Sequence, residues 1–360
     1  MRFFKFQKKN KKKTNCFFFE RKKGGTMRYL VTGCCGFIGS QFVRNILHDA
    51  TTEFVVGIDC LYPCATKTMC ESTPRYIFYQ NNINENGLIA RLLVEHNIDV
   101  LVHFAAQSHV DTSFSSPHNY INDNICGTFQ ILEALRQTAS HHITKMIMIS
   151  TDEVYGENKV DEPHYEKSSL LQPSSVYSAS KAAAEMLCHA YVASHKIPIV
   201  TLRGNNCYGR QYPEKLIPRF IKLILEGKPL TIQGTGKQKR SFLYVDDFCS
   251  AISCLIEKGE IGAVYNVGSD DELSVLEVAQ ILAEEMKCEL KLRFVEDRNF
   301  NDTRYLVHSD KLKELGWKQK TRFREGLRKT IAWFQSKESN NYWVQEYQIP
   351  IQKDVNKMHS

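Results

Sequence analysis

The sequence predicts an α/β protein built on a doubly wound parallel sheet, with a smaller mixed α/β lobe that closes over a cleft. Short, almost continuously apolar segments alternate with longer segments whose apolar residues recur at helical spacing. This alternation is typical of parallel strands that are covered by helices on both faces. A chain of 360 residues is also long enough to bury the large core that such a sheet requires.

The strands expected in the sheet are short and end at polar or glycine residues. In chain order they cover residues 28–33, 54–59, 98–106, 145–151 and 197–204. The helices expected between them cover residues 37–49, 118–137 and 177–195. After residue 204 the elements become shorter and include a Gly-rich turn at 234–237, which predicts the second lobe. Residues 241–259 form a predicted strand and helix that could rejoin the sheet.

Charge and hydropathy limit the classes of function. The formal net charge is +7, but residues 1–26 hold ten Lys or Arg residues and one acid, which leaves 37 basic and 39 acidic residues. We therefore expect no nucleic-acid surface on the folded body. No run of about 18 apolar residues occurs, so no membrane span is expected. The basic, Phe-containing extension is compatible with a membrane-surface segment, a nuclear address or a nucleic-acid arm, but we expect it to be disordered.

The twelve cysteines form no C-x-x-C pair, and no histidine accompanies the irregularly spaced Cys60, Cys64 and Cys70. This arrangement predicts free thiols in a cytoplasmic protein rather than disulfides or a metal site.

A glycine-rich turn connects the first predicted strand to the first helix. Gly33, Gly36 and Gly39 are spaced three residues apart, and glycines here let the backbone approach a pyrophosphate at the positive end of the helix. Asp59 ends the second predicted strand, where a carboxylate can accept hydrogen bonds from both ribose hydroxyls of NAD. Residues 60–66 contain no cation for the 2′-phosphate of NADP. The pattern predicts NAD as the cofactor, with a turn that only packs helix on strand as the alternative.

Tyr177 and Lys181 are four residues apart in a helix-forming run, so their side chains share one face of the helix. An ammonium group beside a phenol stabilises the phenolate and lowers the pKa of the phenol from about 10 toward neutrality. A phenolate can take the proton from a sugar hydroxyl while the attached carbon yields a hydride. Thr151, at the end of the fourth predicted strand, adds a hydroxyl at the same edge of the sheet. The alternative is a pair that only packs on the helix surface.

Two carboxylic residues, Asp152 and Glu153, directly follow Thr151. Once C4 of a hexose is a ketone, one carboxylate can remove the acidified hydrogen at C5 while a carboxylic acid protonates the departing C6 hydroxyl. This division requires two carboxyl groups with different pKa values. Because neighbours on a strand point to opposite faces, both acids can serve only if the strand ends at Thr151. The alternative is a solvated acidic loop.

Residues 27–335 resemble the dTDP-glucose and UDP-glucose 4,6-dehydratases, members of the extended short-chain dehydrogenase/reductase superfamily with a Rossmann fold. The motifs that carry the resemblance are, in chain order, VTGCCGFIGS, HFAAQSHVDTSF, STDEVYG, YSASK, NNCYGRQYPEKLIP, RSFLYVDD, YNVGS and DRNFNDTRY. The resemblance implies NAD-dependent loss of water from a nucleotide-linked glucose to give the 4-keto-6-deoxy sugar, a step toward deoxysugars such as rhamnose. It also implies a homodimer paired through the helices near 118–137 and 177–195.

The resemblance also implies roles for individual residues. Tyr177 is the base for oxidation at C4, Lys181 tunes it and Thr151 hydrogen-bonds O4, while Asp152 is the acid at the C6 hydroxyl and Glu153 the base at C5. The implied cofactor residues are Gly33, Gly36, Phe37, Ile38, Gly39, Asp59, Asn82, Ile83, Ala105, Ala106, Tyr177, Lys181 and Asn206. The implied substrate residues are Ser108, His109, Thr151, Asn205, Lys215, Leu216, Arg240, Asn266, Arg298 and Arg304.

These motifs divide the chain into four parts. Residues 1–26 are the basic extension, 27–204 with 241–262 the NAD-binding Rossmann domain, 205–240 with 263–335 the nucleotide-sugar lobe, and 336–360 a polar tail expected to be frayed.

Some positions depart from the usual pattern of the family. Asn82 stands where an Asp is usual near the adenine, Gln107 replaces a Glu, and Thr231 and Gln233 replace Pro and Tyr near the nucleotide base. The motifs RSFLY and RNFND favour UDP-glucose slightly over dTDP-glucose. The competing readings are a sugar-nucleotide 4-epimerase, which needs no acid at C6, a nucleotide-glucuronate decarboxylase and a non-catalytic NAD-binding scaffold.

Overall fold

The computed structural model describes residues 25–138, 143–158, 162–167, 169–297 and 302–344. In these residues the larger sheet has seven parallel strands in the order β10-β6-β5-β4-β1-β2-β3. The strands are β1 (Met27–Thr32), β2 (Thr52–Asp59), β3 (Tyr76–Gln80), β4 (Val100–His103), β5 (Lys145–Thr151), β6 (Ile199–Gly204) and β10 (Val264–Val267). The strand order reverses direction at β1, and ligands bind at the carboxyl ends of the strands beside such a switch point.

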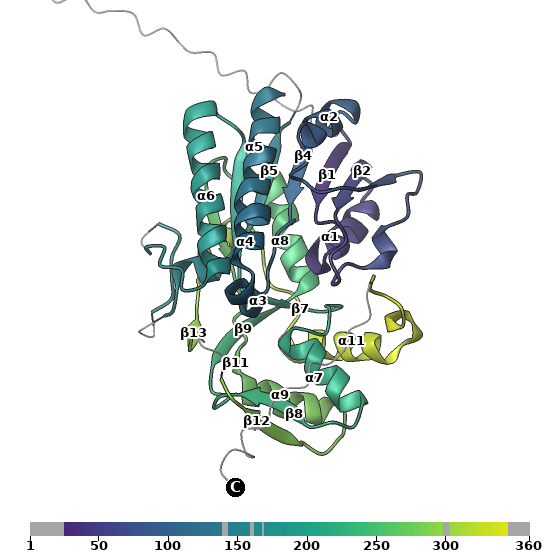
Figure 1. Ribbon diagram of the computed structural model, residues 1–360, viewed down its shortest axis with the longest axis vertical. Helices are drawn as coiled ribbons and strands as arrows, with labels where there is room; N and C mark the ends of the chain where they lie inside the picture. Colours follow the sequence, from purple (N-terminus) through teal and green to yellow (C-terminus); the bar gives the residue numbers. More distant parts are fainter. Residues whose placement is uncertain (1–24, 139–142, 159–161, 168, 298–301, 345–360) are drawn as a thin grey trace, which may run out of the picture.

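Helices cover both faces of this sheet (Figure 1). One face is covered by α2 (Leu88–Glu95), α5 (Gly127–Gln137) and α6 (Val176–His195), and the other by α1 (Phe37–Leu47) and α8 (Val245–Lys258). The side chains of β1 alternate between the two cores, because Leu30 packs with the first set of helices and its neighbour Val31 with the second. The structure therefore confirms the predicted doubly wound fold.

The helix expected over 118–137 is present as three consecutive pieces. It comprises α4 (Pro117–Tyr120), a π-helical segment (Ile121–Cys126) and α5, and it is preceded by the short α3 (Val110–Ser115).

The second lobe contains two small sheets. In one of them β9 (Lys239–Tyr244) pairs with β7 (Asn206–Tyr208), β11 (Glu272–Ser274) and β13 (Arg304–Tyr305), and in the other β8 (Leu230–Gln233) pairs with β12 (Leu292–Val295). The lobe also contains the helices α7 (Leu216–Leu225), α9 (Val275–Glu285), α10 (Asp310–Glu314) and α11 (Phe323–Gln335).

Three expectations about these elements were wrong or incomplete. The strand expected near 241 does not rejoin the large sheet, since β9 pairs within the second lobe. The edge strand is β10 instead, which pairs in parallel with β6 although the sequence placed it in the lobe. The aromatic-rich β3 and the helix α2, neither of which was predicted, complete the other edge of the sheet.

The tail expected to be frayed is ordered as far as the description reaches. Residues after α11 form a 3-10 turn (Lys337–Ser339) and then hydrogen-bond to the loop after β2. The expectation rested on polar composition, whereas Tyr342 and Trp343 supply apolar surface that packs on α11. Among the described residues, no helix has both the length and the apolar character required to cross a bilayer.

Candidate active site

The glycine turn lies between β1 and α1 and is formed by backbone geometry. Gly33 has a φ of +69°, and a Cβ on it would lie 2.6 Å from the backbone nitrogen of Ala105. A Cβ on Gly39 would collide with the carbonyl oxygen of Gly33. Only glycine fits at both positions, so the turn brings main-chain N–H groups and the positive end of α1 to an open surface. This is a cradle for a pyrophosphate.

Asp59 ends β2 beside this turn, as predicted. Its carboxylate accepts hydrogen bonds from the backbone N–H groups of Cys35 (2.9 Å) and Leu61 (2.8 Å). Burial raises the pKa of Asp59, while these backbone donors oppose the shift. The carboxylate is thus held by the turn itself, with its remaining lone pairs available to a ribose.

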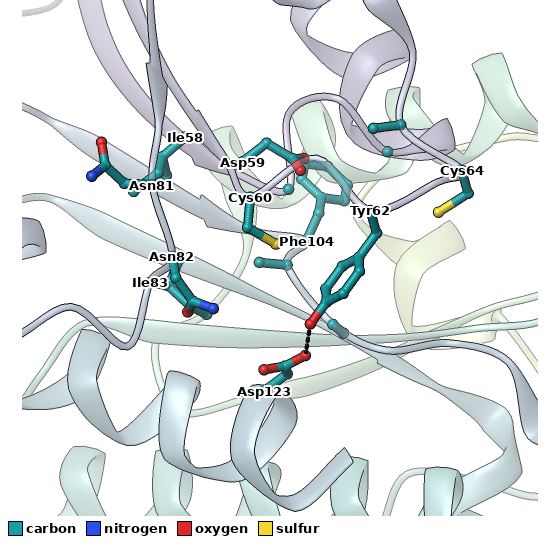
Figure 2. Close-up of a pocket in the computed structure, with 15 residues that line it drawn as sticks. Ile58, Asp59, Cys60, Tyr62, Cys64, Asn81, Asn82, Ile83, Phe104 and Asp123 are labelled. Atoms are coloured by element: carbon teal, nitrogen blue, oxygen red, sulfur yellow. Dashed lines mark hydrogen bonds between the residues drawn. The ribbon is translucent and has the colours of Figure 1, made fainter. Parts of the chain in front are cut away.

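A pocket opens beside Asp59 and is shown in Figure 2. Of the residues implied to hold the cofactor, it brings together Gly33, Gly36, Asp59, Asn82, Ile83, Ala105 and Ala106. None of the described residues that line it is Lys or Arg, which favours NAD over NADP. Sequence reasoning missed the far wall, where Tyr62 in the loop after β2 donates its hydroxyl to Asp123 of the π-helical segment (2.7 Å).

A larger cleft continues from this pocket along the carboxyl ends of β1, β5 and β6. The implied site residues that line it are Gly33, Gly36, Phe37, Ile38, Gly39, Ala106, Ser108, His109, Thr151, Asp152, Glu153, Tyr177, Lys181, Asn205, Asn206, Lys215 and Leu216. The implied catalytic residues and most of the implied cofactor residues therefore share one continuous space.

The chain leaves the strand conformation directly before Asp152 and Glu153. Strand β5 ends at Thr151, and a 3-10 turn (Asp152–Tyr155) begins at the next residue. The Thr151 hydroxyl accepts from the backbone N–H of Glu153 (3.3 Å) and so caps this turn. Both acids line the cleft, because the alternation of a strand no longer applies after Thr151.

The two acids have different surroundings. The Asp152 side chain is buried, whereas Glu153 is half-buried. Burial and then the charge of Glu153 raise the pKa of Asp152 to about 7, although hydrogen bonds from Asn205 and Thr151 oppose the shift. The Asn205 amide donates directly to the Asp152 carboxylate. Asp152 is therefore suited to donate a proton near neutral pH.

Tyr177 and Lys181 occupy the first turns of α6, which begins with a capping box formed by Ser175 and Ser178. Burial lowers the pKa of Lys181 to about 8, and the nearby Glu185 opposes this shift. The predicted lowering of the Tyr177 pKa was wrong for the protein alone. Burial and the charge of Glu153 raise the pKa of this phenol, and a hydrogen bond from Thr151 only partly offsets them.

A buried ion pair links the middle of this helix to β6. Arg203 on β6 binds both carboxylate oxygens of Glu185 (3.0 and 3.1 Å from Nε), one turn beyond Lys181 on α6. The Arg203 guanidinium also lies 4.7 Å over the ring of Tyr155, in the turn that carries the two acids. The pair thus joins the Tyr177 helix to the acidic turn.

The second lobe adds a charged extension to the cleft. Lys215, Leu216 and Arg240 line it together with Glu153 and Asn206. The Lys215 ammonium donates to the carbonyl of Ser108 (2.9 Å). The Arg240 guanidinium donates to the carbonyls of Lys239 (2.7 Å) and Asp302 (2.8 Å) and lies 4.7 Å over the ring of Tyr305.

Some implied substrate residues are not brought to the described cleft. Asn266 is fully buried, where it accepts from the Tyr155 hydroxyl (2.9 Å) and donates to the carbonyl of His164 (3.3 Å). Arg304 is held by both carboxylate oxygens of Glu272 (2.6 and 2.9 Å) and is absent from the residues that line the described pockets. Arg298 lies outside the described residues.

Arg219, which sequence reasoning missed, lines the charged part of the cleft instead. Its spacing could have indicated this position, because Arg219 lies four residues after Lys215 and hence about one helical turn along α7.

Taken together, the parallel sheet, the glycine turn and the Tyr–Lys pair on α6 are those of an extended short-chain dehydrogenase/reductase. The family model described as GDP-mannose 4,6 dehydratase matches residues 30–330. The chain belongs to this family of nucleotide-sugar 4,6-dehydratases, within which its relatives are the NDP-glucose enzymes.

Relatives with known names support this assignment. A trifunctional UDP-glucose 4,6-dehydratase/UDP-4-keto-6-deoxy-D-glucose 3,5-epimerase/UDP-4-keto-L-rhamnose-reductase of Arabidopsis thaliana is 42% identical over 85% of this chain and 46% of its own length. The chain thus spans about half the length of this relative. The dTDP-D-glucose 4,6-dehydratase of Homo sapiens is 37% identical over 86% of this chain and 91% of its own length.

The solved structures include a similar enzyme with ligands. A dTDP-glucose 4,6-dehydratase from Streptomyces venezuelae, solved with NAD bound, has a TM-score of 0.82 and 34% identity, covering 88% of this chain and 99% of its own. A Thermus thermophilus UDP-glucose 4-epimerase in complex with NAD has a TM-score of 0.80 and 29% identity, covering 86% and 100%.

Proposed function

We propose that this protein is an NAD-dependent hydro-lyase that converts UDP-glucose or dTDP-glucose to the 4-keto-6-deoxy sugar nucleotide. The observation that carries the proposal is the acid pair at the end of β5. Asp152 and Glu153 share the cleft with Tyr177 and Lys181, and the pKa of Asp152 is raised to about 7. One carboxyl is then able to act as an acid while its neighbour acts as a base.

The cofactor pocket fits NAD. The glycine cradle has no room for a Cβ at Gly33, Asp59 lies beside it, and the lining carries no described Lys or Arg. Bound there, NAD would supply reversible hydride transfer, first from C4 and then to C6, so the reaction would involve no net oxidation.

The chain's own residues would divide the proton transfers. Tyr177 removes the proton from the C4 hydroxyl, while Lys181 and the positive nicotinamide lower its pKa from the raised value in the protein alone. Thr151 orients that hydroxyl. Glu153 takes the proton from C5, and Asp152 gives a proton to the departing C6 hydroxyl, which leaves as water. As the hydride returns to C6, Glu153 gives its proton back to C5, and the proton that Tyr177 took from O4 replaces the one that Asp152 lost. Each such proton transfer contributes about 10²- to 10⁴-fold to the rate.

The charged extension would hold the diphosphate and the nucleoside. Arg240 provides a planar fork, and Lys215 a point charge, for the phosphate oxygens. The higher identity to the plant UDP-glucose enzymes, 42% against 37% for the human dTDP-glucose enzyme, supports UDP-glucose as the preferred substrate.

The decisive experiment is mass analysis of the products. Purified protein is expected to carry NAD and to convert UDP-glucose, without added cofactor, to a product lighter by one water. dTDP-glucose serves as the second arm, and the ratio of kcat/KM values gives the preference. Recovery of a galactose isomer at unchanged mass would establish the 4-epimerase reading instead, and a protein that carries NAD but converts neither substrate would support the NAD-binding scaffold.

We also propose a homodimer in the cytoplasm. Three large apolar side chains are exposed on the face formed by the π-helical segment, α5 and α6, namely Ile121, Phe129 and Met186. A second copy of the chain would cover them. All cysteines in the described residues are free thiols, which supports a reducing compartment. Light scattering of the wild type and of Met186→Glu tests the dimer, which the charge is expected to weaken.

A further inference from the structure

The C-terminal residues 340–344, here called the strap, join two walls of the cleft. In Figure 1 the yellow segment after α11 reaches the loop between β2 and β3. Within the strap, the carbonyl of Tyr342 accepts from the backbone N–H of Lys67 (2.8 Å), and the N–H of Val344 donates to the carbonyl of Ala65 (2.8 Å). Thr66 and Trp343 pair between these two bonds as an antiparallel bridge.

The strand partner of the strap is a wall of the cofactor pocket. Cys64 and Ala65 line that pocket, and the backbone N–H of Thr66 donates to the carbonyl of Cys35 within the glycine turn (2.7 Å). Ala65 and Thr66 are both buried. The strap therefore hydrogen-bonds to the segment around Thr66, and this segment in turn hydrogen-bonds to the glycine turn.

Trp343 extends the same contact to the substrate side. Its ring centroid lies 5.5 Å from that of Tyr212 at an interplanar angle of 83°. Tyr212 is buried at the wall of the larger cleft, and its carbonyl accepts from the backbone N–H of Lys215. Trp343 also packs edge-on against Trp333 of α11, at 5.6 Å. The indole of Trp343 thus contacts the second lobe, while the backbone of Trp343 pairs with Thr66 beside the cofactor pocket.

We propose that Trp343 is a positioning residue whose strap fixes the cofactor wall and the Lys215 loop relative to each other, so that its loss weakens the retention of both ligands. The inference rests on the proposed function for the identity of those ligands. The strap touches neither ligand site directly, because its contacts run through Ala65, Thr66 and Tyr212. Its loss is therefore expected to change binding more than the chemical step.

Two matched pairs of variants test the strap in the full chain. A chain ending at Val344 keeps the strap, and a chain ending at Ser339 removes it. Trp343→Phe keeps a ring against Tyr212, and Trp343→Ala removes it. The measurements are the dissociation rate of bound NAD, the KM and kcat for UDP-glucose, and the melting temperature.

The chain ending at Ser339 and Trp343→Ala are expected to release NAD about fivefold faster and to have a KM about fivefold higher, a change that corresponds to roughly 1 kcal/mol for the loss of an aromatic pair. Their kcat is expected to change less than about twofold, and the other two variants are expected to match the wild type. The proposal is overturned if NAD release and KM stay constant, or if only the melting temperature falls. If the shortened chain does not fold, the two Trp343 variants decide. A wild type that carries no NAD would refute the proposed function itself, an outcome distinct from a strap without effect.

Discussion

The cofactor half and the substrate half of the cleft are built in different ways. The cofactor half uses main-chain groups at strand ends, and even its carboxylate, Asp59, is held by two backbone N–H groups. The substrate half uses long charged side chains from the second lobe, such as Lys215 and Arg240. The first half is therefore set by the fold of one sheet, whereas the second depends on how two lobes and their side chains meet.

The acids lie at the border between the halves. Asp152 and Glu153 follow a strand of the large sheet, but they also line the cleft that the second lobe closes. Their backbone is set by the end of β5, while their environment depends on residues such as Asn205 that lead into the lobe. Changes at the border should therefore affect chemistry, and changes in either half should affect the binding of one ligand.

The largest effect is expected from the paired substitution Asp152→Asn with Glu153→Gln. Both changes keep the size of the side chains but remove the acid and the base, so dehydration is expected to slow by about 10³-fold or more. Oxidation at C4 needs neither carboxyl, so bound NADH is expected to accumulate and to absorb in the near ultraviolet. Tyr177→Phe is the matched control, because it should block oxidation and leave no NADH. Normal dehydration by the double variant would refute the assignment of both acids.

The next effect concerns the cost of burying Asp152. Its pKa rises from 3.8 to about 7 on folding, so the folded state binds more protons than the unfolded state between these values. The contribution of Asp152 to stability is therefore greatest below about pH 4, falls as the pH rises through about 7, and is constant above. Asp152→Asn removes this loss, and at pH 8 it is expected to be more stable than the wild type by up to about 4 kcal/mol, at about 1.4 kcal/mol per pKa unit. At pH 4 the difference should vanish.

Urea denaturation of both proteins at several pH values measures this difference. The exposed Glu257→Gln variant controls for the simple loss of one carboxylate. A stability gap between Asp152→Asn and the wild type that does not change with pH would show that Asp152 is not buried as the structure has it.

The two halves also differ in how far sequence alone predicts them. Gly33, Asp59, Tyr177 and Lys181 were predictable, because each follows from spacing within one strand–turn–helix unit. The sequence alone indicated only that β5 must end at Thr151 if both acids are to serve, and not that it does end there. The structure meets that condition because Thr151 caps a 3-10 turn, a local choice that hydropathy does not reveal.

The substrate half was less predictable, for physical reasons. Strand β9 pairs with β7, β11 and β13 together, and these three strands lie far apart in the chain. Arg304 was implied as a ligand residue, but Glu272 on β11, on the other side of β9, holds it. The strap was missed because the pairing of Trp343 with Thr66 spans most of the chain and leaves no local pattern.

Within the cofactor half, Asp59→Asn is expected to weaken NAD binding about 10- to 100-fold, because hydrogen bonds to a charged acceptor contribute roughly 1.5–3 kcal/mol. The asparagine amide keeps one acceptor oxygen, so it cannot accept hydrogen bonds from the backbone of the turn and from the ribose as a carboxylate can. Fluorescence titration of cofactor-free protein with NADH measures the change. The affinity for UDP alone is expected to stay within about twofold, since the Asp59 pocket and the charged extension have no lining residue in common. An equal loss for both ligands would mean that the halves are not independent.

The smallest effect is expected from Arg240→Lys in the substrate half. Lysine keeps the charge but loses the planar fork and the stacking over Tyr305, so UDP binding is expected to weaken about 3- to 10-fold while NAD binding is unchanged. Arg304→Lys is the matched control, because resemblance to the family implies a ligand role for Arg304 and the structure instead pairs it with Glu272. Calorimetry with UDP is expected to separate them, with a loss of affinity for Arg240→Lys and none for Arg304→Lys. An equal loss at both positions would mean that Arg304 leaves Glu272 to bind the nucleotide, and that the substrate half rearranges on binding while the cofactor half does not.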